Sequence, residues 1–536
     1  MKRYDNRLKS MVWPALLALA AMGHPAQAAE LEVLATGAVS GAFKTVVADY
    51  EKQSGHRLKM SWGPSLGQSH EAIPVRIRSG QAPDVLIMVS TELDRLIREQ
   101  RFTASARLDV AQSGVGVGVK AGSPVPDISD VAKLRQALLA APSVAYSEGA
   151  SGTYIQNVLL KRLGVEHEVA AKRHLVPGKQ LVGEVLAEGG AALGLQQISE
   201  LRVVPGVHYV GPLPEEVQKI SVLTAAVSGK STHSAEALDF LRYLGSPAAV
   251  AAFQRSGLDL PDVPATVVER RLVRSGQVQI EVLSQGQGPA IVMLPSLGRS
   301  VRDFDLVAAR LASQGFRVIR PEPRGIGASQ GPLEGLTLHD FAADVAAVCD
   351  AEKTGPAVIL GHAWGSQPAR MLAVDRPDLV KGLIMAAASA GKLPPGSTEK
   401  PYGRLRDAID GSGNPALPQA QRLQYLKQAF FAPGHDPSEW LEGWYEANHH
   451  AEAHARNVTP IDSYFSGGST APILDLQAEY DPVAPRRFSN VLKSMLGERV
   501  TIVVIKNASH ALAPEQPQAM ADAIADFAKK VFSARR

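Results

Sequence analysis

The chain reads Ala357-Val358-Ile359-Leu360-Gly361-His362-Ala363-Trp364-Gly365 at the point that decides the fold of its second half. The first four residues form an apolar run, which is typical of a strand buried inside a parallel sheet. Gly361 and Gly365 then allow a tight turn from a strand into a helix, and such a turn exposes the side chain at its centre, here Ala363. The stretch therefore predicts an α/β domain with a site at residue 363.

Strands and helices alternate on both sides of this turn. From about residue 270 the pattern predicts two opening strands at 271–274 and 278–283, followed by a buried strand at 290–294. A helix at 304–314, a strand at 316–320 and a second helix that ends at about 344 come next. This order, together with the turn at Ala363, strongly resembles that of the α/β-hydrolases. The resemblance covers residues 270–536 and implies an α/β-hydrolase-fold domain.

The resemblance also implies positions for a catalytic triad. Ala363 stands where serine esterases carry serine and where haloalkane dehalogenases and epoxide hydrolases carry aspartate. Asp481 matches the family acid and His510 matches the family base, because each follows a late strand in the expected chain order. The backbone N–H groups of Leu297 and Trp364 match the oxyanion site.

Alanine carries no nucleophilic atom, so the chemistry of this domain stays open. Loss of serine from an intact triad costs about 10⁶ in rate, which predicts almost no acyl-enzyme turnover. Three outcomes remain. In the first, Asp481 and His510 act together as a general base on water or on an acidic substrate proton. In the second, Ser366, or less readily Ser296, replaces the missing nucleophile. In the third, the domain binds a ligand without turnover. For Ser366 a structural place at the start of a helix is expected.

An insertion at about residues 391–470 interrupts the hydrolase-like core where such folds usually carry a cap. Its aromatic residues either line a pocket or form the core of the cap, because both roles need the same side chains. They are Phe430, Phe431, Trp440, Trp444, Tyr445 and Tyr464. His449, His450 and His454 invite a metal reading, because His450 and His454 would share one helix face at i, i+4. No third ligand follows at motif spacing, and a solvated polar face is their expected role. We expect no metal and no cofactor.

The first half, residues 29–257, repeats the order of strand, small-residue loop and helix. Strands are predicted at 31–35, 56–62, 84–89, 114–119, 143–146 and 220–227, and a last helix from about 235. This order, together with the phrases Gly80-Gln81-Ala82-Pro83-Asp84-Val85 and Gly149-Ala150-Ser151-Gly152, resembles the two-lobed periplasmic solute-binding proteins of the molybdate-binding type. The resemblance implies a ligand cleft between two lobes.

In that family an oxyanion is held by hydroxyls and by N–H groups at helix starts, which carry unsatisfied donors and a partial positive charge. By position, Ser40, Ser65 and Ser151 are implied to line the cleft, and each also reads as a plain helix N-cap. Gln196 and Gln197 stand where molybdate binders commonly place a tyrosine. Their amides suit a carboxylate or a small organic ligand as readily as a tetrahedral oxyanion, so the ligand is predicted only as a small anion or small metabolite.

The first 28 residues predict where the protein goes. A basic start precedes an apolar stretch at 11–22 and the small-residue site Ala26-Gln27-Ala28, which is the layout of a cleaved secretory signal. We therefore expect a periplasmic or secreted protein. The apolar stretch is shorter than the roughly 20 residues of a membrane helix, so we expect no membrane insertion of the mature chain.

Charge and composition exclude several partners and sites. The formal net charge is +3 and becomes neutral without the four basic residues and one acidic residue of the signal, so no nucleic-acid binding is expected. The single cysteine, Cys349, excludes an intramolecular disulfide and a cysteine zinc cluster. Residues 258–269, with Pro261 and Pro264, are the predicted linker, and its shortness requires the two halves to be neighbours.

These features predict an exported two-domain protein. It couples a small-anion or small-metabolite binding module to an α/β-hydrolase-fold domain with an atypical active site, and a membrane transporter is a candidate partner. Two alternatives stay open. One is a purely binding or sensing protein with a catalytically dead hydrolase domain, and the other is an active base-only hydrolase or lyase that uses His510 and Asp481.

Overall fold

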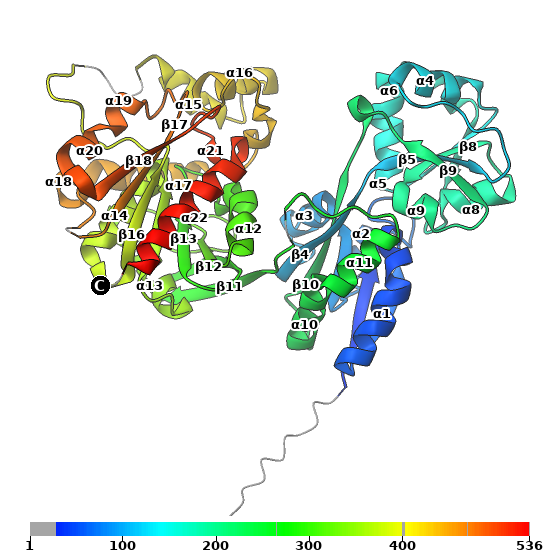
Figure 1. The fold of residues 1–536 in the computed structure, drawn as a ribbon, viewed down its shortest axis with the longest axis horizontal. Coiled ribbons are helices and arrows are strands. Elements are labelled where there is room, and N and C mark those ends of the chain that lie inside the picture. The colour runs from blue at the N-terminus through cyan, green and yellow to red at the C-terminus, as the bar shows by residue number, and fades with distance from the viewer. Residues whose placement is uncertain (1–27, 264, 399–402, 469, 535–536) are drawn as a thin grey trace, which may run out of the picture.

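The computed structural model describes residues 28–263, 265–398, 403–468 and 470–534, and Figure 1 shows how its parts are arranged. A hydrolase-like domain lies on one side of the molecule and two smaller lobes lie on the other. The predicted signal segment falls outside the described residues, apart from Ala28. Among the residues that are described, no helix is both long enough and apolar enough to cross a bilayer.

The second domain is built on one large sheet. Its strands are β11 (Val268–Ser275), β12 (Val278–Gln285), β13 (Ala290–Leu294), β14 (Arg317–Pro321), β15 (Ala357–His362), β16 (Val380–Ala386), β17 (Ile473–Ala478) and β18 (Val500–Ile505). β11, β12 and β14 pair antiparallel, whereas the ladder from β14 through β13 to β18 is parallel. β13 and β15 are buried along their whole length, because both faces of the sheet are covered, which accounts for their continuous apolar runs.

Helices cover both faces of this sheet. α12 (Asp305–Ser313) and α22 (Pro517–Ser533) pack on one face, and α13 (Leu338–Glu352), α14 (Ser366–Asp375) and α20 (Val491–Leu496) pack on the other. Between β16 and β17 the chain leaves the sheet and forms the insertion. Its longer helices are α15 (Arg406–Ser412), α16 (Gln419–Ala429) and α17 (Glu446–Val458), followed by the short α18 (Ile461–Tyr464).

Lobe 1 comprises residues 30–113 and 221–258. The strands of its sheet lie in the order β2 (Arg57–Trp62), β1 (Glu30–Ala35), β3 (Val85–Val89), β10 (Ser221–Ser228) and β4 (Ala104–Ser113). On one face pack α1 (Ser40–Ser54), α10 (Ser234–Leu244) and α11 (Pro247–Arg255), and on the other pack α2 (Ile73–Arg78) and α3 (Ser90–Arg98). The lobe therefore has its own two-sided core.

Lobe 2 comprises residues 114–220. The strands of its sheet lie in the order β7 (Arg173–Val176), β6 (Val144–Ser147), β8 (Leu193–Gln197), β5 (Val115–Lys120) and β9 (Val207–Pro212). One face is covered by α4 (Val131–Ala140), α7 (Glu166–Ala170) and the helical run of α5 (Ala150–Tyr154), a π turn (Ile155–Leu159) and α6 (Leu160–Arg162). The other face is covered by α8 (Val182–Glu188) and α9 (Ile198–Arg202).

β4 joins lobe 1 to the hydrolase domain. It pairs antiparallel with β11 at Arg107 with Val268 and at Ala106 with Glu269. The sheet of lobe 1 and the sheet of the hydrolase domain thereby form one 13-stranded sheet in the described chain. Each of the two strands covers the edge of the other, which would otherwise present unpaired backbone groups.

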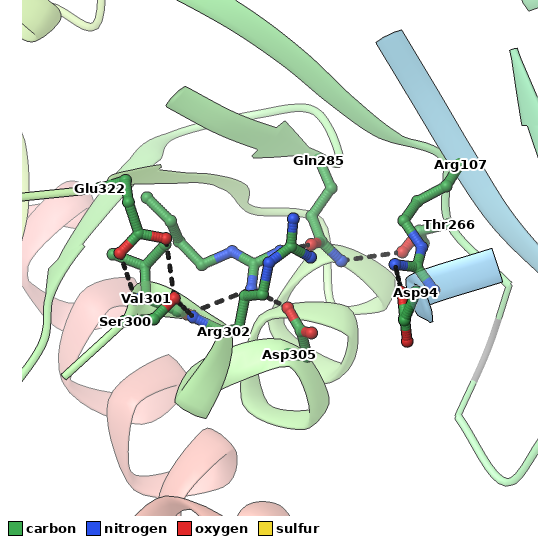
Figure 2. A network of polar contacts seen from close by, with 10 residues as sticks. Asp94, Arg107, Thr266, Gln285, Ser300, Val301, Arg302, Asp305 and Glu322 are labelled. Carbon is green, nitrogen blue, oxygen red and sulfur yellow. Dashed lines mark hydrogen bonds and ion pairs between the residues drawn. The ribbon is translucent and has the colours of Figure 1, made fainter. Parts of the chain in front are cut away.

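A network of polar side chains supports this junction (Figure 2). Arg320 on β14 is fully buried, donates a hydrogen bond to Gln285 Oε1 at 2.7 Å and forms an ion pair with Asp305. Gln285 in turn donates to the Thr266 hydroxyl at 3.1 Å, in the segment that links the two halves. On β4, Arg107 donates to Asp94 Oδ1 at 2.8 Å. The network thus connects the core of the hydrolase domain to the linking segment.

The predicted strands of both halves lie within three residues of their expected bounds. The sequence analysis missed β4, β7 and β9. The segment that links the halves is shorter than predicted, because Leu258 is buried in the core of lobe 1 and β11 already begins at Val268. The helix after β2 begins only at Ile73, where Pro74 occupies the first turn.

Replacing Arg320 tests the network of Figure 2. Arg320→Leu is expected to destabilise the protein by about 2–3 kcal/mol, because it removes the buried donor to Gln285 and the partner of Asp305. Urea unfolding of the full chain, followed by tryptophan fluorescence, measures the change. Arg101→Leu is the control, since Arg101 is exposed, lies outside this network, and a change within about 0.5 kcal/mol is expected there. Equal unfolding midpoints for the two variants would contradict the role given to Arg320.

Candidate functional site

A cleft of about 520 Å³ lies between lobe 1 and lobe 2. The loops after β1, β2 and β3 form its wall in lobe 1, and the loops after β6, β7 and β8 form its wall in lobe 2. Ligand crevices of α/β folds lie at such strand ends. The lining residues are Thr36, Gly37, Trp62, Gly63, Pro64, Ser65, Val89, Ser147, Gly149, Ala150, Ser151, Gly178, Lys179, Gln180, Leu181, Gln196, Gln197 and Glu200.

Four of the five residues predicted for this cleft are among those that line it, namely Ser65, Ser151, Gln196 and Gln197. Ser40 is not among them. The 3-10 turn Gly37–Val39 follows β1 directly, so that Thr36 and Gly37 face the cleft and Ser40 already belongs to α1.

None of the three serines acts as a helix N-cap in the described chain. The N-cap residues of α1 and α5 are Val39 and Gly149, and Ser65 precedes no helix directly. The Ser65 hydroxyl instead accepts a hydrogen bond from the N–H of Val89 at 3.1 Å. Ser151 lies in the first turn of α5 and is 5% exposed.

The two glutamines differ in what they bind. Gln196 Oε1 accepts a hydrogen bond from the N–H of Val182 at 2.8 Å, which fixes its side chain within lobe 2. Gln197 Oε1 is buried and has no hydrogen-bond partner in the described part of the chain. An unsatisfied buried polar group costs about 1–3 kcal/mol, so this amide is suited to a polar ligand.

Sequence reasoning missed two charged residues of the cleft, Lys179 and Glu200. Lys179 belongs to the loop after β7, a strand that the sequence analysis did not identify. Glu200 follows Gln196 by four residues, on α9, and nothing in the strand, loop and helix pattern marks it. Helical spacing does not relate it to Gln196, because Gln196 lies on β8 and Glu200 on α9.

The carboxyl group of Glu200 is unusual. Burial raises its pKa to about 7, and a hydrogen bond from Gln196 opposes part of this rise. The carboxyl also reaches the opposite lobe, because a Cβ added to Gly37 would lie 2.9 Å from Glu200 Oε1. The cleft therefore contains a carboxyl group that exists in both protonation states near neutral pH.

Lys179 links the two lobes across the mouth of the cleft. Its ammonium lies 3.0 Å from Glu71 Oε1, and its backbone N–H donates to Glu71 Oε2 at 3.0 Å. These hydrogen bonds hold the pKa of Glu71 below its usual range. The Lys179 side chain is 64% exposed, so this ion pair is expected to be weak and sensitive to salt.

The second candidate site is the turn at Ala363 in the hydrolase domain. Ala363 has φ = 47°, a left-handed conformation that is costly for a residue with a Cβ and typical of a nucleophile elbow. A Cβ at Gly361 would lie 2.3 Å from the backbone of Gly365, and a Cβ at Gly365 would lie 2.5 Å from the carbonyl oxygen of Pro295. The turn therefore requires both glycines and presents the methyl group of Ala363, which is half-buried.

The acid and base positions come together beside this turn. His510 Nδ1 lies 2.9 Å from Asp481 Oδ2, and both side chains are buried. Asp481 Oδ1 accepts hydrogen bonds from the N–H groups of Val483 and Ala484 at 2.8 and 2.9 Å, which fixes the carboxylate. The pair thus has the arrangement in which an aspartate orients a histidine whose Nε2 serves as a base.

His362 precedes Ala363 and packs against the base, with ring centroids 5.3 Å apart. Its Nε2 donates to the carbonyl oxygen of His510 at 2.8 Å. Burial lowers the pKa of His362 to about 3, so that its ring is neutral over the physiological range. His362 therefore positions the His510 loop without adding charge to it.

Glu452, a side chain of the cap, lies against the loop that carries Leu297 of the predicted oxyanion site. The N–H of Gly298, next to Leu297, donates to Glu452 Oε2 at 2.7 Å, and the Trp364 indole donates to the Glu452 carbonyl oxygen at 3.1 Å. Glu452 is fully buried, and burial raises its pKa well above the usual range. The backbone N–H of Trp364 lies in the first helical turn after β15, where N–H groups have no partner within the helix.

The other residues singled out in this domain lie mainly in helices and in hydrophobic cores. Ser366 opens α14 and is 1% exposed, and Ser296 is 6% exposed. Phe430, Phe431 and Trp440 pack together as the core of the cap, with Trp444 against them. Tyr464 belongs to the main core, and Tyr445 is exposed. His449, His450 and His454 lie on α17, and no group of three metal-ligating side chains occurs among the described residues.

Two family models match the chain, one described as bacterial extracellular solute-binding protein over residues 31–259 and one as alpha/beta hydrolase fold over residues 289–517. An aconitate isomerase from Pseudomonas sp is 39% identical over 228 residues, which are 42% of this chain and 87% of that protein. A protein of Variovorax paradoxus (strain S110) that carries the name carbamate hydrolase is 27% identical over 259 residues, 47% of this chain and 96% of the relative.

Among solved structures, a thermophilic esterase from Thermogutta terrifontis matches with a TM-score of 0.40 and 22% identity, covering 49% of this chain and 99% of that one. The two family matches confirm the predicted organisation. A solute-binding domain precedes an α/β-hydrolase-fold domain in one chain.

Ala363→Ser tests whether the hydrolase site is dormant or dismantled. The elbow, Asp481 and His510 are in place, so the serine variant is expected to gain at least about 100-fold in hydrolysis of short-chain nitrophenyl esters. His510→Ala in the same background should abolish the gain. The wild-type chain should take up no fluorophosphonate, as measured by intact-mass spectrometry. A folded Ala363→Ser variant that is as inert as the parent would show that the catalytic geometry has been lost.

Proposed function

The chain belongs to the bacterial extracellular solute-binding protein family through residues 31–259, and on that basis we propose that it binds a small polycarboxylate between its two lobes and isomerises it, as an enzyme of the aconitate isomerase type. The α/β-hydrolase-fold domain is an attached module with an atypical active site. Ser65, Ser151, Gln196 and Gln197 are the proposed ligand-binding residues.

The observation that carries this proposal is the chemistry of the cleft. Its lining combines hydroxyls, amides and backbone N–H groups with one carboxyl group of raised pKa, Glu200. Hydroxyl, amide and N–H donors suit the carboxylates of a small ligand. A carboxyl group that gains and loses a proton near pH 7 is suited to act on such a ligand rather than only to hold it. The similarity to the isomerase extends over 228 residues, which are 87% of that relative.

For the hydrolase domain we favour binding without acyl-enzyme turnover. Ala363 offers no nucleophile, and Glu452 already takes the Gly298 N–H beside the oxyanion position. The second candidate is a base-only hydrolase or lyase, and the buried pair of His510 and Asp481 is the observation that favours it.

Export is part of the proposal and rests on the signal-like residues 1–28. An exported protein would bind its polycarboxylate outside the cytoplasm. A membrane transporter that accepts the ligand from the lobes is a candidate partner, as solute-binding domains imply.

The isomerase activity is tested by incubating the full chain with trans-aconitate or cis-aconitate and following both isomers by proton NMR. The same equilibrium mixture is expected from either side. Molybdate, sulfate and phosphate, titrated by calorimetry, should bind at least tenfold more weakly than the tricarboxylate. Tight binding of an inorganic oxyanion without any isomerisation would instead support a purely solute-binding role.

Gln197→Leu tests the binding residues, because it removes a buried amide whose Oε1 has no hydrogen-bond partner in the described part of the chain. It is expected to weaken tricarboxylate binding about 10-fold to 100-fold, the loss of one or two hydrogen bonds to a charged ligand. Ser40→Ala is the matched control, since Ser40 lies outside the cleft lining, and its affinity should equal that of the wild type. Equal affinities for all three proteins would place the ligand elsewhere.

A further inference from the structure

The titratable groups of the cleft are few. Of the residues that line it in the described chain, only Lys179 and Glu200 carry side chains that exchange protons in water at ordinary pH. Lys179 is largely exposed and already paired with Glu71. The single cysteine, Cys349, is buried in the hydrolase domain, so an addition by a thiol cannot start in this cleft. Glu200 is therefore the group left to move a proton there.

We propose that Glu200 is the acid–base residue of the interlobe cleft, which takes a proton from one end of an allylic polycarboxylate and returns it to the other end. This inference deepens the proposed isomerase function and rests on it. It adds a named catalytic residue, the group that carries the proton in a 1,3-shift.

The step is balanced in atoms and electrons. The Glu200 carboxylate takes a proton from the CH₂ group between the double bond and a carboxylate, and the electron pair of the broken C–H bond enters the allyl system. The double bond then forms at the former single bond, and the Glu200 carboxyl gives its proton to the former vinylic carbon. Glu200 ends as it began, and nothing is oxidised or reduced. The conformation held about the single bond decides whether the new double bond is cis or trans.

The position of Glu200 fits this role. Its carboxyl comes from lobe 2 and lies against Gly37 of lobe 1, at the place where the two walls of the cleft meet. A ligand held between Thr36–Gly37 and Gln196–Gln197 would therefore lie beside it. Gly37 leaves the room that the carboxyl occupies, since a Cβ there would lie 2.9 Å from Oε1.

The environment of Glu200 supports both halves of the cycle. Burial raises its pKa to about 7, and the Gln196 amide stabilises the ionised form in part. No charged neighbour contributes to that shift, and Lys179, the cation of the cleft, is held by Glu71. A carboxyl group with a pKa near the working pH is efficient both as a base and as an acid. An ordinary glutamate would be a poorer base and would return the proton less readily.

Glu200→Gln in the full chain is the central test. The amide has the same shape but cannot accept and return a proton, so kcat for aconitate isomerisation should fall by about 10²-fold to 10⁴-fold. The Kd for aconitate, from calorimetry, should change less than tenfold. Glu188→Gln, an exposed glutamate of the same lobe, is the matched control and should keep the wild-type kcat. In D₂O the wild type should place deuterium on the carbon that gains hydrogen, and Glu200→Gln should slow this as well.

A pH profile separates a catalytic role from a structural one. For the wild type, kcat/KM should fall toward acid with an apparent pKa near 7, as the base becomes protonated. Folding stability should also decrease as pH rises from about 4.5 to about 7, because the unfolded chain loses the Glu200 proton more readily than the native one. Glu200→Gln should lose the pH dependence of kcat/KM and show a smaller decrease of stability between about pH 4.5 and about pH 7, because Glu322, Glu452 and Asp475 also have raised pKa values. Its melting temperature at pH 8 should be equal to or above that of the wild type.

The outcomes separate the two proposals. A wild type that isomerises aconitate, with Glu200→Gln at more than one third of its kcat, overturns the role of Glu200 and leaves the proposed function standing. A wild type that neither isomerises aconitate nor exchanges its hydrogens overturns both. Gly37→Ala gives a second route to the same residue, since it displaces the carboxyl without removing it. A displacement of about 1 Å should cost about 100-fold in kcat, and an unchanged kcat would contradict the placement of Glu200.

Discussion

The antiparallel pairing of β4 with β11 is the contact on which the arrangement of this protein depends. Two residue pairs suffice to align the sheet of lobe 1 with the sheet of the hydrolase domain, because each strand offers the other an otherwise open edge. Arg320, Gln285 and Thr266 support the junction from the hydrolase side. Lobe 1 is therefore fixed to the hydrolase domain through its sheet. Lobe 2 contacts lobe 1 through its chain crossings, the Lys179–Glu71 pair and the packing of α9 against the start of α1.

Both candidate sites follow from the same physics of parallel strands. Loops after such strands meet at one edge of the sheet, and the interlobe cleft and the turn at Ala363 are each built there. The two sites differ in what their side chains can do. The cleft combines donors for an anion with a carboxyl group that titrates near neutral pH, whereas the turn combines a base with a methyl group.

The site at Ala363 has the strained backbone of a nucleophile elbow but no nucleophilic side chain. The left-handed backbone at Ala363 and the close approach of Gly365 to Pro295 are the features of a turn that presents a nucleophile. His510 and Asp481 remain paired in the buried site. Glu452, from the cap, takes the Gly298 N–H that adjoins the oxyanion position. The geometry is thus preserved around a side chain that cannot attack a substrate.

The sequence by itself determined the two-domain organisation and the turn between Gly361 and Gly365, because these depend on local patterns of apolar residues and glycines. Asp481 and His510 were implied by the resemblance to the α/β-hydrolases, and Ser65, Ser151, Gln196 and Gln197 by the resemblance to the molybdate-type binding proteins. Only the tertiary structure decided that Ser40 turns away, that β4 pairs with β11, that Glu452 is buried, and that the half-buried Glu200 lies in the cleft. Burial and cross-lobe contacts join residues far apart in the chain, and the pKa of a carboxyl group depends on those surroundings rather than on its neighbours in sequence.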